Sequence, residues 1–262
     1  MRRFIQFCLM LLCGSMLLIA QTPPAREKPA KAADQKTDID PLALKVLKAV
    51  TDPIRDAKTY SFRTRQMREN LGTNGQIITY FTNSEVTVSR PDKLHVTFKG
   101  RGGQEAELFY NAGTAVLYSP GPKLYARITT AKTLDGVLDE LEKRNIYLPV
   151  KNFLESDPYA ALAPDLKTGY VIGKVDVFGK PVHQLAFTED KAEWQLWTTG
   201  EPNPRIRMLQ VIDKGRTHQP RVVVEFTDWN LNATAKPDMF TFKAPAGARE
   251  IEFAELRKGM RK

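Results

Sequence analysis

The sequence predicts a mainly β, α+β domain in which a large, strongly bent antiparallel sheet wraps around two or three helices. From Lys58 onward, apolar and polar residues alternate with a period of two through most of the chain, which is typical of strands with one buried face. Turn-forming pairs such as Asn74-Gly75 separate these runs, and few stretches have helical spacing. A sheet of about a dozen strands must curl or close, because large twisted sheets do not stay flat.

The composition indicates one globular domain. The chain has 262 residues, of which 42% are hydrophobic and 26% charged, too charged for an integral membrane protein and too apolar for a disordered one. Both cysteines, Cys8 and Cys13, lie near the N-terminus, which excludes a disulfide framework, a zinc-thiolate site or a catalytic thiol later in the chain. The net charge of +9 is compatible with peripheral contact to an anionic membrane and is equally explained by ordinary solubility, whereas the scatter of the charges argues against a nucleic-acid partner.

Residues 1–20 have the pattern of a secretory signal peptide. Arg2 and Arg3 precede an apolar run that ends at Ala20, where a small residue suits cleavage. Because the run is about the minimum length that spans a bilayer, an uncleaved inner-membrane anchor is the alternative. Residues 21–39 are rich in Pro, Ala and Lys, so we expect a flexible linker there.

The folded domain is expected to span residues 40–255, with a basic tail at 256–262. Asp40-Pro41 is an N-cap followed by proline at the first helical position, and Thr133 caps a second amphipathic helix. Short helical turns are expected at 149–162. Strands are expected at 59–69, 76–90, 93–99, 105–111, 114–119, 124–129, 170–177, 182–188, 193–198, 205–212, 221–228 and 239–243.

The chain lacks the residue patterns of known catalytic, metal and cofactor sites. Its three histidines, His95, His183 and His218, have no second histidine at metal-ligand spacing. Gly100-Arg101-Gly102-Gly103 lies between two strands and is better explained as a hairpin loop than as an anion cradle. We assign no catalytic residue, no metal and no cofactor, and we expect that the protein is not an enzyme.

Several short motifs occur in the order and spacing of a known family. They are Arg90-Pro-Asp-Lys-Leu94, Leu108-Phe-Tyr-Asn111, Thr133-Leu-Asp-Gly-Val-Leu-Asp139, Ser156-Asp-Pro-Tyr159, Glu193-Trp-Gln-Leu-Trp197, Pro204-Arg-Ile-Arg207, Asp228-Trp-Asn-Leu-Asn232 and Phe240-Thr-Phe-Lys-Ala-Pro-Ala-Gly-Ala248. With the flanking pattern, residues 41–253 resemble an uncharacterised family of predicted periplasmic proteins in the superfamily of the LolA and LolB lipoprotein carriers.

The resemblance implies a half-open barrel of about eleven antiparallel strands, with two or three helices over its concave face and an apolar cavity between them. It also implies a periplasmic location and no catalytic residue. Carriers of this superfamily bind the acyl chains of lipoproteins and use one arginine in the cavity, for which Arg63, Arg65 and Arg68 are the candidates in this chain.

Strand alternation places a set of apolar side chains on one side of their strands, and the second helix adds one more. These candidate cavity residues are Phe62, Leu94, Val96, Phe98, Leu108, Tyr110, Leu138, Trp194, Leu196, Val222, Val224 and Phe226. An acyl chain of about sixteen carbons gains roughly 13 kcal/mol on leaving water, and a concave face of this kind offers it comparable apolar surface. The alternative explanation is that these residues pack on the helices and fill the interior.

We therefore expect an exported, monomeric, non-enzymatic protein that holds a lipid or the acyl part of a lipoprotein, as a carrier or as a sensor. The alternative is an envelope interaction domain with a packed core and no ligand, which docks another envelope protein through a strand edge or face. A hydrolase with unrecognised catalytic residues is the third hypothesis.

Overall fold

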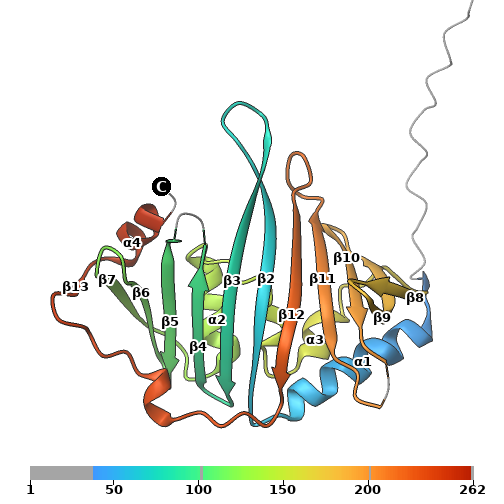
Figure 1. Ribbon diagram of the computed structural model, residues 1–262, viewed down its shortest axis with the longest axis horizontal. Helices are drawn as coiled ribbons and strands as arrows, with labels where there is room; N and C mark the ends of the chain where they lie inside the picture. The colour runs from blue at the N-terminus through green and yellow to red at the C-terminus, as the bar shows by residue number, and fades with distance from the viewer. Residues whose placement is uncertain (1–37, 101–102, 201, 261–262) are drawn as a thin grey trace, which may run out of the picture. The chain divides into compact units, whose positions relative to one another are not determined.

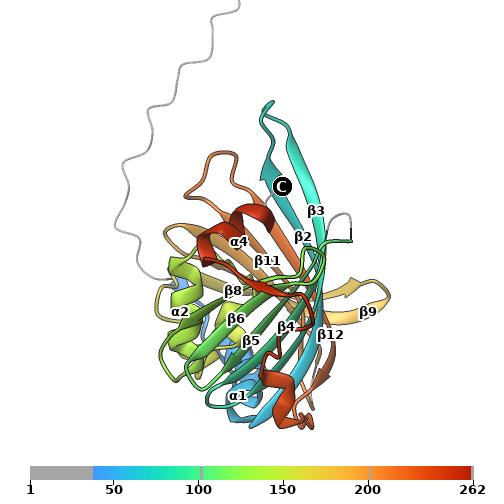
Figure 2. The same ribbon diagram turned by 90° about the vertical axis from the view of Figure 1, so that its left-hand side faces the viewer.

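The computed structural model describes residues 38–100, 103–200 and 202–260. In this part of the chain, thirteen strands form one sheet in the order β1-β8-β9-β10-β11-β12-β2-β3-β4-β5-β6-β7-β13 (Figure 1). The sheet is curved and open, and α1 and α2 lie on the same side of it (Figure 2). The signal peptide and most of the linker predicted from the sequence lie outside the described residues.

The strands β2 to β12 pair with one another only in antiparallel fashion, and a two-residue strand adds in parallel at each edge of the sheet. The strand bounds are β1 Asp38–Ile39, β2 Thr59–Leu71, β3 Ile77–Ser89, β4 Lys93–Lys99, β5 Glu105–Asn111, β6 Thr114–Ser119, β7 Leu124–Thr129, β8 Thr168–Val177, β9 Lys180–Thr188, β10 Ala192–Thr198, β11 Ile206–Asp213, β12 Arg221–Asn230 and β13 Arg249–Glu250. The predicted fold class, a mainly β half-open barrel of about eleven antiparallel strands, is confirmed.

The register between strands explains why the apolar positions form one surface. Phe62 pairs with Val86, Val86 with Val96, Val96 with Leu108 and Leu108 with Leu117, and all five side chains are buried. Because paired residues in an antiparallel sheet point to the same face, this row crosses five strands without a break. This row of the concave face is thus apolar from β2 to β6, and the next row contains the buried polar side chains Thr64 and Ser84.

Three helices and a short 3-10 helix cover the concave face: α1 Pro41–Asp56, α2 Leu134–Lys143, η2 Lys151–Phe153 and α3 Pro158–Leu162. The Asp40 carboxylate accepts a hydrogen bond from the Leu42 amide at 2.8 Å, and the Thr133 hydroxyl accepts one from the Gly136 amide at 3.2 Å, so both predicted N-caps are confirmed. Among the described residues, no helix is long and apolar enough to cross a bilayer.

The structure differs from the sequence prediction near the C-terminus. The strand predicted at 239–243 is wrong: the chain forms a 3-10 helix there, η3 Pro237–Phe240, and then runs along the convex face. The two phenylalanines of residues 239–243 pack without strand pairing. Phe240 is buried, and the ring of Phe242 lies 5.5 Å from that of Phe109. Residues 256–260, expected in the basic tail, belong to helix α4 Phe253–Met260, and Leu256 is buried in the core.

Candidate ligand-binding site

The structure brings all twelve predicted cavity residues into one apolar cluster between the sheet and the helices. Ten of them are buried, while Phe98 and Val222 are half-buried and pack against the cluster. Leu138 contributes from the helical side, in the middle of the buried face of α2. Residues that are far apart in the sequence, such as Phe62 and Phe226, stand with ring centroids 5.6 Å apart. Alternation along each strand therefore identified the buried face of the sheet.

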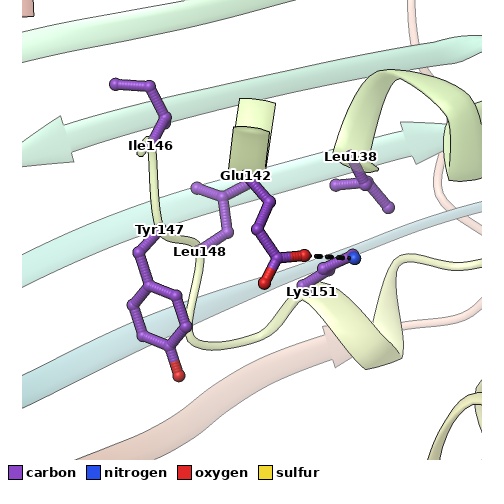
Figure 3. Close-up of a pocket in the computed structure, with 6 residues that line it drawn as sticks. All are labelled: Leu138, Glu142, Ile146, Tyr147, Leu148 and Lys151. Carbon is purple, nitrogen blue, oxygen red and sulfur yellow. Dashed lines mark hydrogen bonds and ion pairs between the residues drawn. The ribbon is translucent and has the colours of Figure 1, made fainter. Parts of the chain in front are cut away.

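Side chains fill the space over this face. The Phe226 ring packs edge-on against Phe153 of η2 at 5.7 Å, so the sheet touches the helical layer directly. The cavity between α2 and the loop that follows it measures about 10 Å³ and is lined by Leu138, Glu142, Ile146, Tyr147, Leu148 and Lys151 (Figure 3). A volume of this size accommodates about one water molecule. In this conformation, an acyl chain would have to displace the helical layer.

A charged cluster ties the helical layer together. The Lys151 ammonium at the start of η2 lies 2.8 Å from Asp139 and 2.6 Å from Glu142, both on α2, and 3.7 Å from Glu155 (Figure 3 shows the pair with Glu142). Burial works against the charged ammonium, but the hydrogen bonds to Asp139 and Glu142 prevail and raise the pKa of Lys151. Helix α2 and η2 are thus joined by ion pairs within the layer.

Hydrogen bonds from two strand residues and from Arg90, which follows β3, anchor this layer. The Tyr110 hydroxyl donates to the carbonyl oxygens of Ala131 at 2.7 Å and Thr133 at 3.0 Å, just before α2. The Tyr60 hydroxyl donates to the Phe153 carbonyl at 3.0 Å, and burial raises its pKa, which keeps it a neutral donor. The third residue is Arg90.

These three anchors lie at one end of the strands. Tyr60 pairs with Val88, Val88 with Leu94 and Leu94 with Tyr110, while Arg90 follows the last residue of β3. The opposite end of α2 leads into a loop where Tyr147 is exposed and Ile146 half-buried. The geometry is that of a cover anchored along one edge, hereafter the anchored edge.

Arg90 is a half-buried cation with unused hydrogen-bonding capacity. Its Nη2 donates to the Glu155 carbonyl at 2.8 Å and lies 3.4 Å from both the Ile54 carbonyl and the Tyr60 hydroxyl. Its Nε and Nη1 are buried and have no hydrogen-bond partner in the structure. No carboxylate of the described residues forms an ion pair with Arg90, whereas the half-buried Arg207 pairs with Glu225 at 2.8 Å. Unpaired buried N–H groups of a guanidinium are suited to carboxylate or phosphate oxygens.

The sequence did not single out Arg90 as a site residue. Arg63 and Arg65, two of the three arginines considered, pair with Glu85 and Glu225 as exposed side chains on the convex face. Arg68 is half-buried on the concave face. The strand expected at 76–90 included Arg90, but the structure ends β3 at Ser89, and the neighbours of Arg90, Ile54 and Glu155, come from distant segments.

A second hollow lies on the convex face, where residues 238–245 pass over β5 and β6. It measures about 270 Å³ and is lined by Glu107, Phe109, Tyr118, Asp238, Thr241, Phe242, Lys243 and Pro245. The Phe242 ring lies 5.2 Å from Tyr118 and 4.8 Å from Tyr125, so the aromatic side chains pack mainly on one another. His95 is half-buried on this face, and its Nε2 lies 3.4 Å from the Glu107 carboxylate. The described residues contain no cluster of three or more His, Cys, Asp and Glu that could hold a metal ion.

Comparisons with known proteins place the chain in a family. The sequence model of the family described as "Predicted periplasmic protein (DUF2092)" matches residues 43–254. No curated protein matches the chain. Among solved structures, LprF from Mycobacterium bovis is similar at 13% identity and a TM-score of 0.46, covering 81% of this chain and 100% of its own. A LolA superfamily protein from Nitrosomonas europaea is similar at 10% identity and a TM-score of 0.37, covering 76% of this chain and 97% of its own.

Proposed function

The chain belongs to the DUF2092 family of predicted periplasmic proteins, and from that premise we propose that it binds an amphiphilic lipid, such as a fatty acid or the acyl part of a lipoprotein, between its sheet and its helical layer. The acyl chain would lie on the concave face, and Arg90 would bind the carboxylate of a fatty acid or the carbonyl oxygen of an ester- or amide-linked acyl group. The protein would act as a carrier or sensor and not as an enzyme.

The observation that carries the proposal is the position of Arg90. A guanidinium with two unpartnered, buried nitrogen atoms lies at the edge of a continuous apolar interior. Each unsatisfied buried donor costs about 1–3 kcal/mol, and an anionic oxygen would remove this cost. A ligand with an apolar chain and an anionic end matches both parts of the site.

The filled interior does not prevent such binding, because the helical layer can exchange with an acyl chain. Burial of Leu134, Val137, Leu138 and Leu141 on α2 contributes roughly 2 kcal/mol each, about 8 kcal/mol together. An acyl chain of about sixteen carbons contributes roughly 13 kcal/mol on leaving water. Displacing α2 about its anchored edge is therefore within the energy that the ligand supplies.

Native mass spectrometry of the protein purified from the periplasm without detergent, followed by organic extraction, tests for a bound lipid. We expect a lipid mass on a substantial fraction of the protein. The wild-type protein should also bind palmitate at least about tenfold more tightly than methyl palmitate, since the ester lacks the charge that Arg90 would bind. Equal binding of the two probes would show that Arg90 does not bind the ligand, and binding of neither would refute the proposal.

A pair of variants separates the role of Arg90 from general effects on folding. Arg90→Gln should lower palmitate affinity about tenfold or more and leave methyl palmitate binding unchanged. Arg207→Gln is the matched control, because Arg207 is also half-buried but already has Glu225 as its partner. If Arg90→Gln lowers both affinities equally, it acts through stability alone.

One observation favours a second function, an envelope interaction domain without a ligand. The interior is filled with side chains, and the cavity beneath the loop after α2 measures only about 10 Å³. A clean apo mass that stays unchanged after incubation with lipids and lipopeptides, together with stoichiometric recovery of one envelope protein, would support this alternative.

A further inference from the structure

The hairpin of β2 and β3 projects beyond the rest of the sheet (Figure 1). Pairing of β2 with β12 ends at Arg68, and pairing of β3 with β4 ends at Asn83. Residues 77–82 of β3 therefore pair with β2 alone, over a length of roughly 20 Å at about 3.4 Å per residue. The tip of the hairpin has solvent on several sides.

The tip is apolar and uncharged. Leu71 is 47%, Ile77 51% and Phe81 69% exposed, and Ile78 is 38% exposed. Leu71 pairs with Ile77 on the convex side, while Ile78 points to the concave side, so apolar side chains surround the tip. Residues 70–84 contain no charged side chain, in a chain of which 26% is charged. Exposed apolar surface of this kind marks an interaction site.

Basic loops flank the hairpin at the same end of the sheet. The β11–β12 loop and the start of β12, residues 214–221, carry Lys214, Arg216 and Arg221 and no carboxylate of their own, although Lys214 lies 3.7 Å from Glu193. Because β12 pairs with β2, this loop lies next to the hairpin. On the other side, Lys99 ends β4 opposite Asn83 as an exposed side chain that pairs with Glu105 at 3.2 Å. An apolar projection between cations complements a bilayer with anionic lipids.

We propose that the β2–β3 hairpin docks the protein on an anionic membrane surface. The side chains of Leu71, Ile77 and Phe81 enter the headgroup region, and the flanking cations bind lipid phosphates. The tip stays at this depth, because the backbone groups at the free edge of β3 require water, which the hydrocarbon core cannot supply. This inference concerns the outer surface and does not depend on the proposed interior ligand.

Flotation of the protein with vesicles tests the proposal. We expect binding to vesicles of phosphatidylethanolamine and phosphatidylglycerol that high salt weakens, and much weaker binding to phosphatidylcholine vesicles. The double variant Ile77→Ser/Phe81→Ser should bind about tenfold less or weaker still, since two exposed apolar side chains no longer leave water. Its thermal unfolding should match the wild type, because neither side chain is buried.

The matched control is Phe178→Ser, which removes a phenylalanine that is 76% exposed in the β8–β9 turn. It should bind vesicles as the wild type does. Equal binding by the wild type and the double variant would overturn the proposal, as would absence of vesicle binding by the wild type. If the double variant instead abolishes self-association or capture of an envelope protein, with vesicle binding unchanged, the hairpin is a protein-docking element.

Discussion

Truncation of Leu138 to alanine distinguishes a movable cover from ordinary core packing. Leu138 is 1% exposed, and Leu→Ala substitutions at such positions cost about 2–5 kcal/mol. We take about 3 kcal/mol, because the neighbouring cavity measures only about 10 Å³ and Leu138 is therefore closely packed in the wild type. If α2 leaves the concave face when the ligand binds, this contact exists only in the closed state.

The substitution then lowers the cost of opening by the same amount by which it lowers stability. A change of about 3 kcal/mol corresponds to an apparent affinity for palmitate that is up to about a hundredfold higher. Leu117→Ala on β6 is the matched control: Leu117 is 2% exposed and also belongs to the core, but it lies on the sheet and stays there when α2 moves. It should lose comparable stability without any gain in affinity.

Urea unfolding gives the loss of stability of each variant, and fluorescence titration with a labelled fatty acid, competed by palmitate, gives the affinity. We expect the two variants to lose similar free energy and only Leu138→Ala to gain affinity. If Leu138→Ala unfolds more easily and binds palmitate no better than the control does, α2 is a fixed part of the core, and the exchange mechanism is refuted.

Three further substitutions test the anchored edge and the core. Tyr110→Phe removes the donor to the two carbonyls before α2, so it should cost about 1–3 kcal/mol in urea unfolding and speed amide hydrogen exchange in α2; unchanged exchange would show that this anchor is not needed. Gly136→Ala should lower the melting temperature although alanine favours helices, because the added Cβ would overlap with Cβ of Ala131; a rise would mean that the turn before α2 relaxes freely. Burial raises the pKa of the Glu189 carboxyl, which accepts a hydrogen bond from the Trp194 indole at 2.7 Å, so its contribution to stability is present below the unfolded pKa of about 4.3 and is lost as the pH rises through the folded value. Glu189→Gln should therefore gain stability relative to the wild type as the pH rises above about 4.3, and a constant difference across that range in urea unfolding would contradict this assignment.

The sequence alone determined the class of fold and the face of each strand. A period of two is a local property, and it assigns Val96 and Leu108 to the same side of the sheet whatever their neighbours are. The N-caps Asp40 and Thr133 could also be predicted from the sequence, because a cap involves residues within one turn. For this reason the candidate residues on the strands lie in one cluster, which Leu138 joins from the second helix.

Only the tertiary structure decided what surrounds that cluster. Whether the interior is open or filled depends on how closely α2 approaches the sheet, and no local pattern encodes that distance. Arg90 meets Ile54 and Glu155, which lie 36 and 65 residues away in the chain. Lys151 likewise meets Asp139 and Glu142 only because the helical layer folds back on itself. Contacts between distant segments are set by packing, so the anchored edge, the two unpartnered nitrogen atoms of Arg90 and the projection of the hairpin beyond the sheet became visible only in three dimensions.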